Sequence, residues 1–237
     1  RHPLFGTPVT TQEQATLLGY VLEENMRIAF PLDHIDNASE TGVGRHPNNI
    51  ILLTASDVMP PVAKLSKDEA VYHFLSGYTS KMPGTEIGLT KPKPEFSAGY
   101  GHPFLVYEPS VYAELFEEKL AEHKPNVWLV NTGWPDGFDQ KRMSLKETRR
   151  IIDVILDGTL SSMPNEAYDT NELGFFVPKA IEGVARNLVN QAEGWTSREA
   201  FMKSAKETAE SFSQNIDRFK NLETSVLVSG PLLYTPR

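Results

Sequence analysis

The 237-residue sequence contains no cysteine. Disulfides, zinc sites built from thiolates and cysteine nucleophiles are therefore excluded. No apolar run approaches the roughly 20 residues that a membrane-spanning helix needs, so the sequence predicts no membrane span. A net charge of -8 and a pI near 5.3 disfavour a nucleic-acid partner, because contacts to phosphate need clustered Lys and Arg.

Common motifs for phosphate and metal binding are missing as well. The chain has neither G-x-x-x-x-G-K-[ST] nor G-x-G-x-x-G, and its six His residues form no H-x-x-x-H pair. Asp33, Asp36 and Asp57 offer oxygen ligands for a hard cation. Because Asp in loops rich in Gly and Pro more often forms turns, we assign no metal ligand.

Composition and length are those of a soluble globular protein, with 40% hydrophobic and 23% charged residues. The length suits one large domain or two small ones. The first residue is Arg1 rather than Met, which indicates either processing of a targeting segment or a sequence cropped at its start. The compartment stays open between the cytoplasm and the mitochondrial matrix.

Hydrophobic periodicity and capping signals predict a mixed α/β fold in which helices flank a sheet. The last predicted helix begins at a capping box of Thr196 and Glu199 and buries a stripe that includes Phe212. Strand 50–53 is continuously apolar, which is typical of a strand covered on both faces. We expect a long loop over 81–101 and mostly irregular structure over 159–195. The predicted helices are 10–24, 66–75, 110–123, 144–156 and 197–219, and the predicted strands are 50–53, 104–107 and 127–130.

Two basic positions are candidates for binding an anion. Arg27 lies in an extended segment before Pro31, and its planar fork matches phosphate or carboxylate. Lys141 and Arg142 precede a predicted helix start at Ser144, where helix amides and cations together suit a phosphate or a polarised base edge. A surface ion pair and a solvated basic turn are the more common roles of such residues.

These segments resemble ATP-dependent phosphoenolpyruvate carboxykinases, and the matches follow the order of that family. They are most specific at Tyr72–Thr79 and Leu129–Trp134. The resemblance implies that 1–237 is one carboxykinase-like carboxy-terminal domain, part of a nucleotide-binding domain. Residues 1–24 would form a divergent helix, 25–158 the best-matched region and 159–237 a looser region. Further matching stretches are Asn25–Asn37, Asn49–Thr54, Pro60–Leu65, Gly84–Glu86, Phe96–Ala98, Lys141–Arg142, Thr148–Arg149 and Ile151–Asp153.

The family converts oxaloacetate and ATP to phosphoenolpyruvate in gluconeogenesis, with divalent metals bridging the phosphates, so the resemblance implies ATP and a divalent metal as cofactors. By position, Arg27 resembles the arginine that contacts substrate and the terminal phosphate of ATP. Such a cation offsets charge that develops during phosphoryl transfer. Arg142, Met143 and Thr148 resemble positions that hold adenine and ribose.

The chain also departs from the family pattern. The phosphate loop and the metal ligands of the family lie upstream of the matched region, and segment 54–61 is about two residues shorter than the usual T-A-D-A-F-G-V-L-P-P. Ser97–Gly101 differs from the usual S-A-C-F-G, Pro83 stands where a small residue is usual, and Asp136 and Asp139 replace a Gly-rich stretch. These departures are typical of relaxed selection on an active site.

Three functions follow as hypotheses. The first is a catalytically inactive structural subunit or scaffold, with protein partners covering exposed sheet edges and apolar faces. The second is the nucleotide-binding carboxy-terminal part of an active carboxykinase. The third is a nucleotide sensor that binds ATP without chemistry.

Overall fold

The computed structural model describes residues 31–36, 38–81, 89, 91–220 and 222–233. The chain divides into two compact units, one of residues 1–46 and 81–93 and one of residues 47–80 and 94–237. In the first unit, the described residues include one short helix, η1 (Leu32–His34). Arg27 and the predicted helix 10–24 lie outside the described residues. The prediction that the whole chain is one domain stays a prediction.

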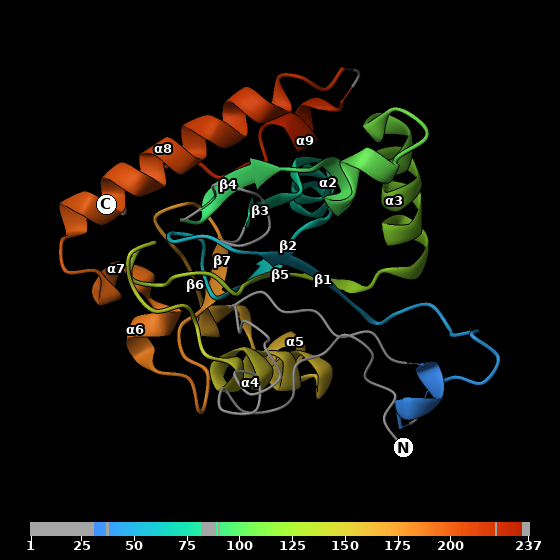
Figure 1. Ribbon diagram of the computed structural model, residues 1–237, viewed down its shortest axis with the longest axis horizontal. Helices are drawn as coiled ribbons and strands as arrows, with labels where there is room; N and C mark the ends of the chain where they lie inside the picture. Colours follow the sequence, from blue (N-terminus) through green and yellow to red (C-terminus); the bar gives the residue numbers. More distant parts are fainter. Residues whose placement is uncertain (1–30, 37, 82–88, 90, 221, 234–237) are drawn as a thin grey trace, which may run out of the picture. The chain divides into compact units, whose positions relative to one another are not determined.

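A five-stranded mixed sheet forms the centre of the second unit, in the order β1-β5-β2-β7-β6 (Figure 1). β1 runs parallel to β5, and β2 is antiparallel to both β5 and β7. A separate two-stranded sheet pairs β3 with β4. The strands are β1 (Asn49–Thr54), β2 (Val62–Leu65), β3 (Tyr78–Lys81), β4 (Lys93–Phe96), β5 (Asn126–Asn131), β6 (Tyr168–Thr170) and β7 (Phe176–Pro178).

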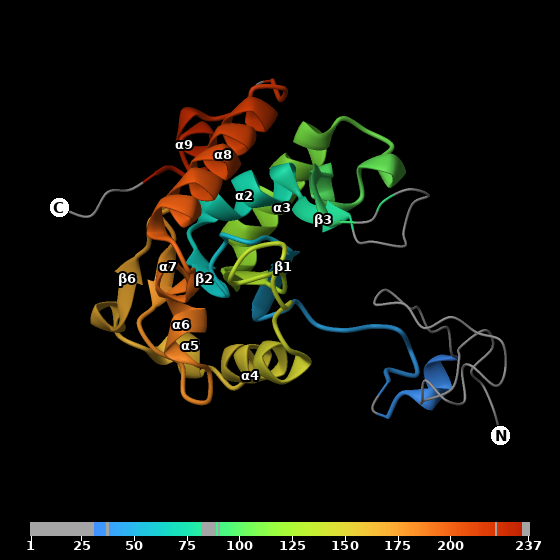
Figure 2. The ribbon, with the colours of Figure 1, turned by 60° about the vertical axis from the view of Figure 1, so that its left-hand side comes forward.

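Helices cover both faces of the five-stranded sheet. α2, α3 and α8 lie on one side of it and α4 and α5 on the other, as both views of the ribbon show (Figures 1 and 2). The predicted mixed α/β class with flanking helices is therefore confirmed. The α-helices are α2 (Lys67–Ser76), α3 (Pro109–His123), α4 (Leu145–Leu156), α5 (Thr159–Ser162), α6 (Arg186–Val189), α7 (Gln191–Gly194), α8 (Arg198–Ile216) and α9 (Thr224–Leu227), and the 3-10 helices are η2 (Ala98–Tyr100), η3 (His102–Phe104) and η4 (Asn165–Ala167).

The alternation of side chains along β5 divides the core into two layers. Val127 and Leu129 pack with α2, α3 and α8, whereas Trp128 and Val130 pack with α4 and α5. Trp128 is fully buried, and its indole N–H donates to Oδ1 of Asn49 at 3.0 Å. β5 is thus the strand that is covered on both faces.

β1 has only part of the environment that its apolar run predicts. Ile50 and Leu52 pack with one core layer and Ile51 with the other, but Leu53 is 53% exposed. Among the described residues, β1 pairs only with β5, so it is an edge strand of the sheet. The prediction that residues 50–53 are covered on both faces is therefore confirmed over 50–52 and wrong at Leu53.

Three other expectations are corrected. The predicted strand 104–107 is instead the end of η3 and a bend, with Phe104 87% exposed and Val106 84% exposed. The predicted loop 81–101 contains β4 and η2 among its described residues. The region 159–195 is not mostly irregular, because it supplies β6 and β7 to the main sheet. β2 lies in a stretch for which no strand was predicted.

Within the described residues, the predicted helices 66–75, 110–123, 144–156 and 197–219 and the predicted strands 50–53 and 127–130 are confirmed, with ends that differ by up to three residues. Two of the capping boxes have the expected geometry. Ser66 and Glu69 cap α2, and Ser144 and Glu147 cap α4, each through reciprocal hydrogen bonds between side chain and backbone. These caps satisfy N–H groups that the first helical turn leaves unpaired. Within the described ranges, no helix is long and apolar enough to cross a membrane.

The N-cap of α8 differs from the predicted one by a residue. Ser197, not Thr196, is the cap, and its Oγ accepts the N–H of Ala200 at 3.2 Å. Ser197→Ala should lower the free energy of unfolding by about 1 kcal/mol, because that N–H loses its acceptor. Thr196→Ala should change it by less than about 0.5 kcal/mol. Urea denaturation of both variants measures the difference, and equal effects would contradict the observed cap.

Candidate nucleotide site at the carboxyl ends of two parallel strands

The candidate site lies where β1 and β5 end. Thr54 and Asn131 are the last residues of these parallel strands and are paired in register. The loop 55–61 follows β1, and the loop 132–144 follows β5, so both loops leave the sheet at one edge. Ligands of open α/β sheets bind outside the carboxyl ends of parallel strands. The topology therefore brings two loops to a position that suits ligand binding.

Asn131 fastens these two loops together. Its side chain is fully buried, and Oδ1 accepts the N–H groups of Ser56 and Gly133, both at 2.9 Å. Its Nδ2 donates to the carbonyls of Ser56 at 3.1 Å and Met59 at 2.6 Å. Both the oxygen and the nitrogen of the amide are thus bonded to backbone groups, which fixes the two loops relative to each other. We call these four hydrogen bonds the Asn131 clasp.

Gly133 allows this close approach of the loops. A Cβ at this position would lie 2.2 Å from the carbonyl oxygen of Ser56 and 2.3 Å from its nitrogen. Both neighbours are backbone atoms that the Asn131 clasp also holds. Only glycine fits between the two loops at position 133. Close packing therefore explains the glycine within the matched stretch Leu129–Trp134.

Arg142 folds back onto the start of its own loop. Its Nε donates to the carbonyl of Thr132 at 2.6 Å, and one terminal nitrogen donates to Oγ1 of the same residue at 3.1 Å. Its guanidinium carbon lies 5.7 Å from the ring centroid of Trp134, which is 4% exposed. The Arg142 side chain is exposed, so a rigid cation beside an aromatic ring is presented at this edge.

Met143 and Thr148 are brought near Arg142 by the chain itself. The Met143 side chain is buried in the core layer of α4, and its N–H donates to the carbonyl of Gly133 at 2.8 Å. Thr148 is half-buried in α4. Met143 thus anchors the loop, and any contact of its side chain with a base would need that residue to leave the core. The roles of these residues towards adenine and ribose stay predictions.

The start of α4 is less open to an anion than its sequence suggests. Oε2 of Glu147 accepts the N–H of Ser144 at 3.1 Å, and the N–H of Glu147 donates to Oγ of Ser144 at 3.2 Å. The box thus uses N–H groups of the first turn and places a carboxylate there. A phosphate at this position would have to compete with the Glu147 carboxylate for these N–H groups.

The acidic loop 135–140 packs on the end of α7. Gly137 lies against the ring of Trp195, and Asp136 lies against Gly194. Oδ1 of Asp136 is buried without a hydrogen-bond partner among the described residues. Asp136, which the sequence comparison predicted to lie near a nucleotide, is therefore half-buried against α7.

Asp57 is not arranged as a cation ligand. It is 5% exposed, and its Oδ2 accepts the hydroxyl of Ser204 at 2.8 Å. Burial raises the pKa of its carboxyl above the ordinary value. No cluster of three or more His, Asp or Glu that could hold a metal occurs in the described ranges.

The sequence singled out Arg142 but not the residues that hold it. Thr132, Trp134 and Asn131 all lie in the L-V-N-T-G-W motif, which was used only as a sign of resemblance. The sequence feature that points to these residues is a short polar run directly after a buried strand, because it marks the carboxyl end of that strand.

Comparison with known proteins identifies the family. The family model described as phosphoenolpyruvate carboxykinase matches residues 9–187. Proteins named "Phosphoenolpyruvate carboxykinase (ATP)" from Campylobacter jejuni strain RM1221 and Methylorubrum extorquens strain PA1 are 42% and 46% identical over 214 and 216 residues. The alignments cover 88% and 89% of this chain and 40% of each relative. The chain thus spans about 40% of the length of these relatives. It belongs to the ATP-dependent phosphoenolpyruvate carboxykinase family.

Proposed function

We propose that this chain carries the adenine-nucleotide-binding part of an ATP-dependent phosphoenolpyruvate carboxykinase. One observation carries the proposal: Arg142 is held by Thr132 beside Trp134 at the carboxyl ends of two parallel strands. A guanidinium fixed in this way can stack on, or donate to, an adenine ring or a ribose oxygen without first losing side-chain entropy. The family relationship supports ATP as the nucleotide, with a divalent metal on its phosphates.

The roles of individual residues follow from their places in this loop. Arg142 would contact the base or the ribose, Met143 would fix the loop from the core beside it, and Thr148 would border the same pocket from the first turns of α4. Arg27 would act on the terminal phosphate, as its position in the family pattern implies. In phosphoryl transfer such cations stabilise charge that develops on the transferred group.

Calorimetric titration of ATP with magnesium into the chain tests this proposal. Arg142→Ala should weaken binding by about 10-fold to 100-fold, since a hydrogen bond to a charged group contributes about 1.5–3 kcal/mol. Arg218→Ala removes an exposed arginine at the end of α8 and should leave binding unchanged. Circular dichroism checks that both variants fold. Equal affinities of the two variants, or no ATP binding by folded chain, would overturn the proposal.

The second candidate is a non-catalytic subunit that serves as a scaffold for protein partners. The observation that favours it is the segment 104–107, where Phe104, Val106 and Tyr107 are all more than half exposed. Exposed apolar side chains that lie together mark interaction surfaces. The departures from the family pattern at Ser97–Gly101 and at loop 135–140 also fit this role.

Turnover and size measured on the protein purified from its natural source separate the two candidates. A scaffold should sediment as a larger assembly and should show no conversion of oxaloacetate and ATP to phosphoenolpyruvate. A monomer with carboxykinase turnover would exclude the scaffold and support the nucleotide-binding role.

A further inference from the structure

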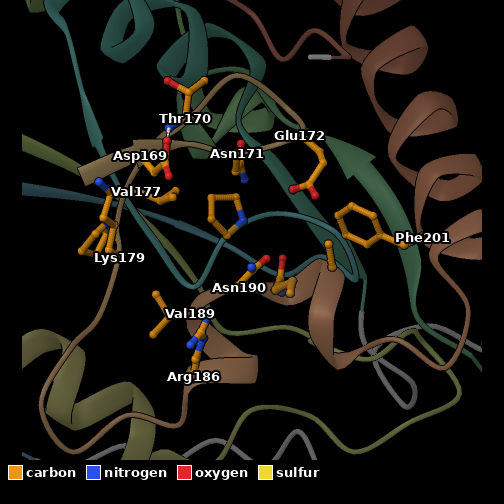
Figure 3. Close-up of a pocket in the computed structure, with 14 residues that line it drawn as sticks. Asp169, Thr170, Asn171, Glu172, Val177, Lys179, Arg186, Val189, Asn190 and Phe201 are labelled. Atoms are coloured by element: carbon orange, nitrogen blue, oxygen red, sulfur yellow. Dashed lines mark hydrogen bonds between the residues drawn. The ribbon is translucent and has the colours of Figure 1, made fainter. Parts of the chain in front are cut away.

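A cavity of about 440 Å³ lies between the β6–β7 hairpin, α6, α7 and the first turn of α8 (Figure 3). Its apolar wall includes Val177, Val189 and Phe201. None of the residues that hold Arg142 lines it. The volume is within the range of small-molecule sites, which are about 300–1,000 Å³. It is therefore a candidate for a ligand other than the nucleotide.

An acid and a base share one face of the hairpin at this cavity. Asp169 pairs with Val177 in the β6–β7 register, and Lys179 directly follows β7, two residues beyond Val177 and on the same face (Figure 3). The Cα atoms of diagonal neighbours of this kind are about 7–8 Å apart. The structure describes both residues and records no ion pair between them. The two charged side chains are thus neighbours on the hairpin that form no ion pair with each other.

Both side chains keep hydrogen-bonding capacity. Oδ1 of Asp169 accepts the N–H of Thr170 at 2.9 Å, which leaves its second oxygen as an acceptor. Nζ of Lys179 donates to the carbonyl of Glu166 at 2.9 Å, which leaves two further N–H donors. These existing bonds also hold the two groups in place.

The other charged residues of the cavity are neutralised by neighbours. Nε of Arg186 lies 3.4 Å from a carboxylate oxygen of Glu193, and Glu172 lies 3.2 Å from a guanidinium nitrogen of Arg198. Asp169 and Lys179 therefore provide the two opposite charges that a ligand would meet. A zwitterionic ligand can pair with both charges, whereas a purely anionic or purely cationic ligand is attracted by one of them and repelled by the other.

Gln191 adds an unused polar group to the cavity wall. It is 5% exposed, and its Oε1 and Nε2 have no hydrogen-bond partner in the part of the chain that the structure describes. An unsatisfied buried group costs about 1–3 kcal/mol, so its presence calls for a functional reason. A side-chain rotation towards the cavity would let the amide bond to a bound ligand.

We propose that this cavity binds a free α-amino acid with an apolar side chain. Asp169 would accept hydrogen bonds from its ammonium group, and Lys179 would donate to its carboxylate. The side chain would lie against Val177, Val189 and Phe201, with the amide of Gln191 completing the polar contacts. Because Asp169 and Lys179 lie on one face of the hairpin and both line the cavity, one carboxylate and one ammonium are available to the adjacent ammonium and carboxylate of one amino acid. The chain would thus carry a metabolite site separate from its nucleotide site.

Calorimetric titration of L-leucine and L-phenylalanine into the chain tests the proposal. We expect at least one of them to bind with a Kd of about 1 mM or tighter. 3-Phenylpropanoate lacks the ammonium group and phenethylamine lacks the carboxylate, so each should bind at least about 10-fold more weakly than L-phenylalanine. No binding of either amino acid to folded chain, or binding of either truncated compound as tight as that of L-phenylalanine, would overturn the proposal.

Variants assign the contacts. Asp169→Asn and Lys179→Met should each weaken amino-acid binding by about 10-fold, whereas Lys179→Arg keeps the charge and should retain it. Asp153→Asn and Lys220→Met are controls on exposed residues and should have no effect. Unchanged affinity in both Asp169→Asn and Lys179→Met would overturn the site. Arg142→Ala should leave amino-acid binding intact, so a failure of the nucleotide proposal is distinguishable from a failure of this one.

Gln191→Leu separates a ligand contact from a structural one. Removal of an unpartnered buried amide should raise the Tm of the ligand-free chain, while the affinity for the amino acid falls. A purely structural glutamine would give a lower Tm, and unchanged affinity would exclude Gln191 from the site.

Discussion

Asn131→Leu should lower the free energy of unfolding by about 4 kcal/mol or more. The clasp satisfies two backbone N–H groups and two backbone carbonyls, all between the loops that follow β1 and β5. Leucine has a similar size and no polar atom, so the N–H groups of Ser56 and Gly133 and the carbonyl of Met59 would lose these hydrogen bonds, whereas the carbonyl of Ser56 would keep the N–H of Trp134 at 2.9 Å. Each such group costs about 1–3 kcal/mol. Urea denaturation monitored by circular dichroism measures the loss.

Asn131→Asp distinguishes the two halves of the clasp. The carboxylate can still accept from Ser56 and Gly133, but it cannot donate to the carbonyls of Ser56 and Met59. Asn165→Ala is the matched control, because Asn165 is exposed and should change stability by less than about 0.5 kcal/mol. If Asn131→Leu is as stable as Asn165→Ala, the clasp does not hold the site together.

Lowering the pH from 6.5 towards 3 should destabilise the chain through His73 by about 1.4 kcal/mol per pH unit. His73 is 1% exposed and lies against the rings of Tyr72, Phe175 and Phe212 at centroid distances of 5.3–5.6 Å. Burial among these rings lowers the pKa of His73 from 6.5 to about 3. Between pH 6.5 and about 3, His73 is therefore protonated in the unfolded chain but not in the folded chain. The free energy of unfolding thus decreases as the pH is lowered across this interval.

His73→Phe should remove this pH dependence, because phenylalanine fits an aromatic environment and cannot be protonated. The free energies of unfolding at pH 7.5, 6.0, 5.0 and 4.0, compared between His73→Phe and the parent chain, isolate the contribution of His73. Asp57 acts in the opposite direction, since its raised pKa favours the folded state as pH falls, but it is common to both chains. His102→Gln replaces an exposed histidine and should keep the parental slope. Parallel slopes for His73→Phe and the parent would contradict the prediction.

The elements that the sequence predicted well have strong local signals. α2 and α4 carry complete capping boxes, and β5 is a long apolar run with turn residues on both sides. The missed strands lack such signals. β6 and β7 have three residues each, too few for a period of two to be recognised, and the pairing of β7 with β2 joins residues that are distant in sequence. At residues 104–107 a strand was predicted where none forms. An apolar run does not reveal whether other residues bury it, and here Phe104 and Val106 are exposed.

The candidate site was predicted in part. Arg142 was identified from its place before a helix start and from the family resemblance. The polar run after β5 marks the place of Asn131 and Thr132, but the hydrogen bonds of Asn131 to the loop after β1 could not be predicted, since they depend on β1 and β5 ending in register. The cavity beside Gln191 gave no sequence signal, because residues of five separate helices and strands contribute to its walls.

The strand order has a consequence for synthesis of the chain. β1 and β2 are made early, but both pair with β5, which ends only at residue 131. At about 5–20 residues per second, the 66 residues between the ends of β2 and β5 take roughly 3–13 s to synthesise. During that interval two apolar strands lack their central neighbour, which exposes them to wrong pairing with other nascent chains. Expression at a lower temperature or with added chaperones should therefore increase the yield of folded chain.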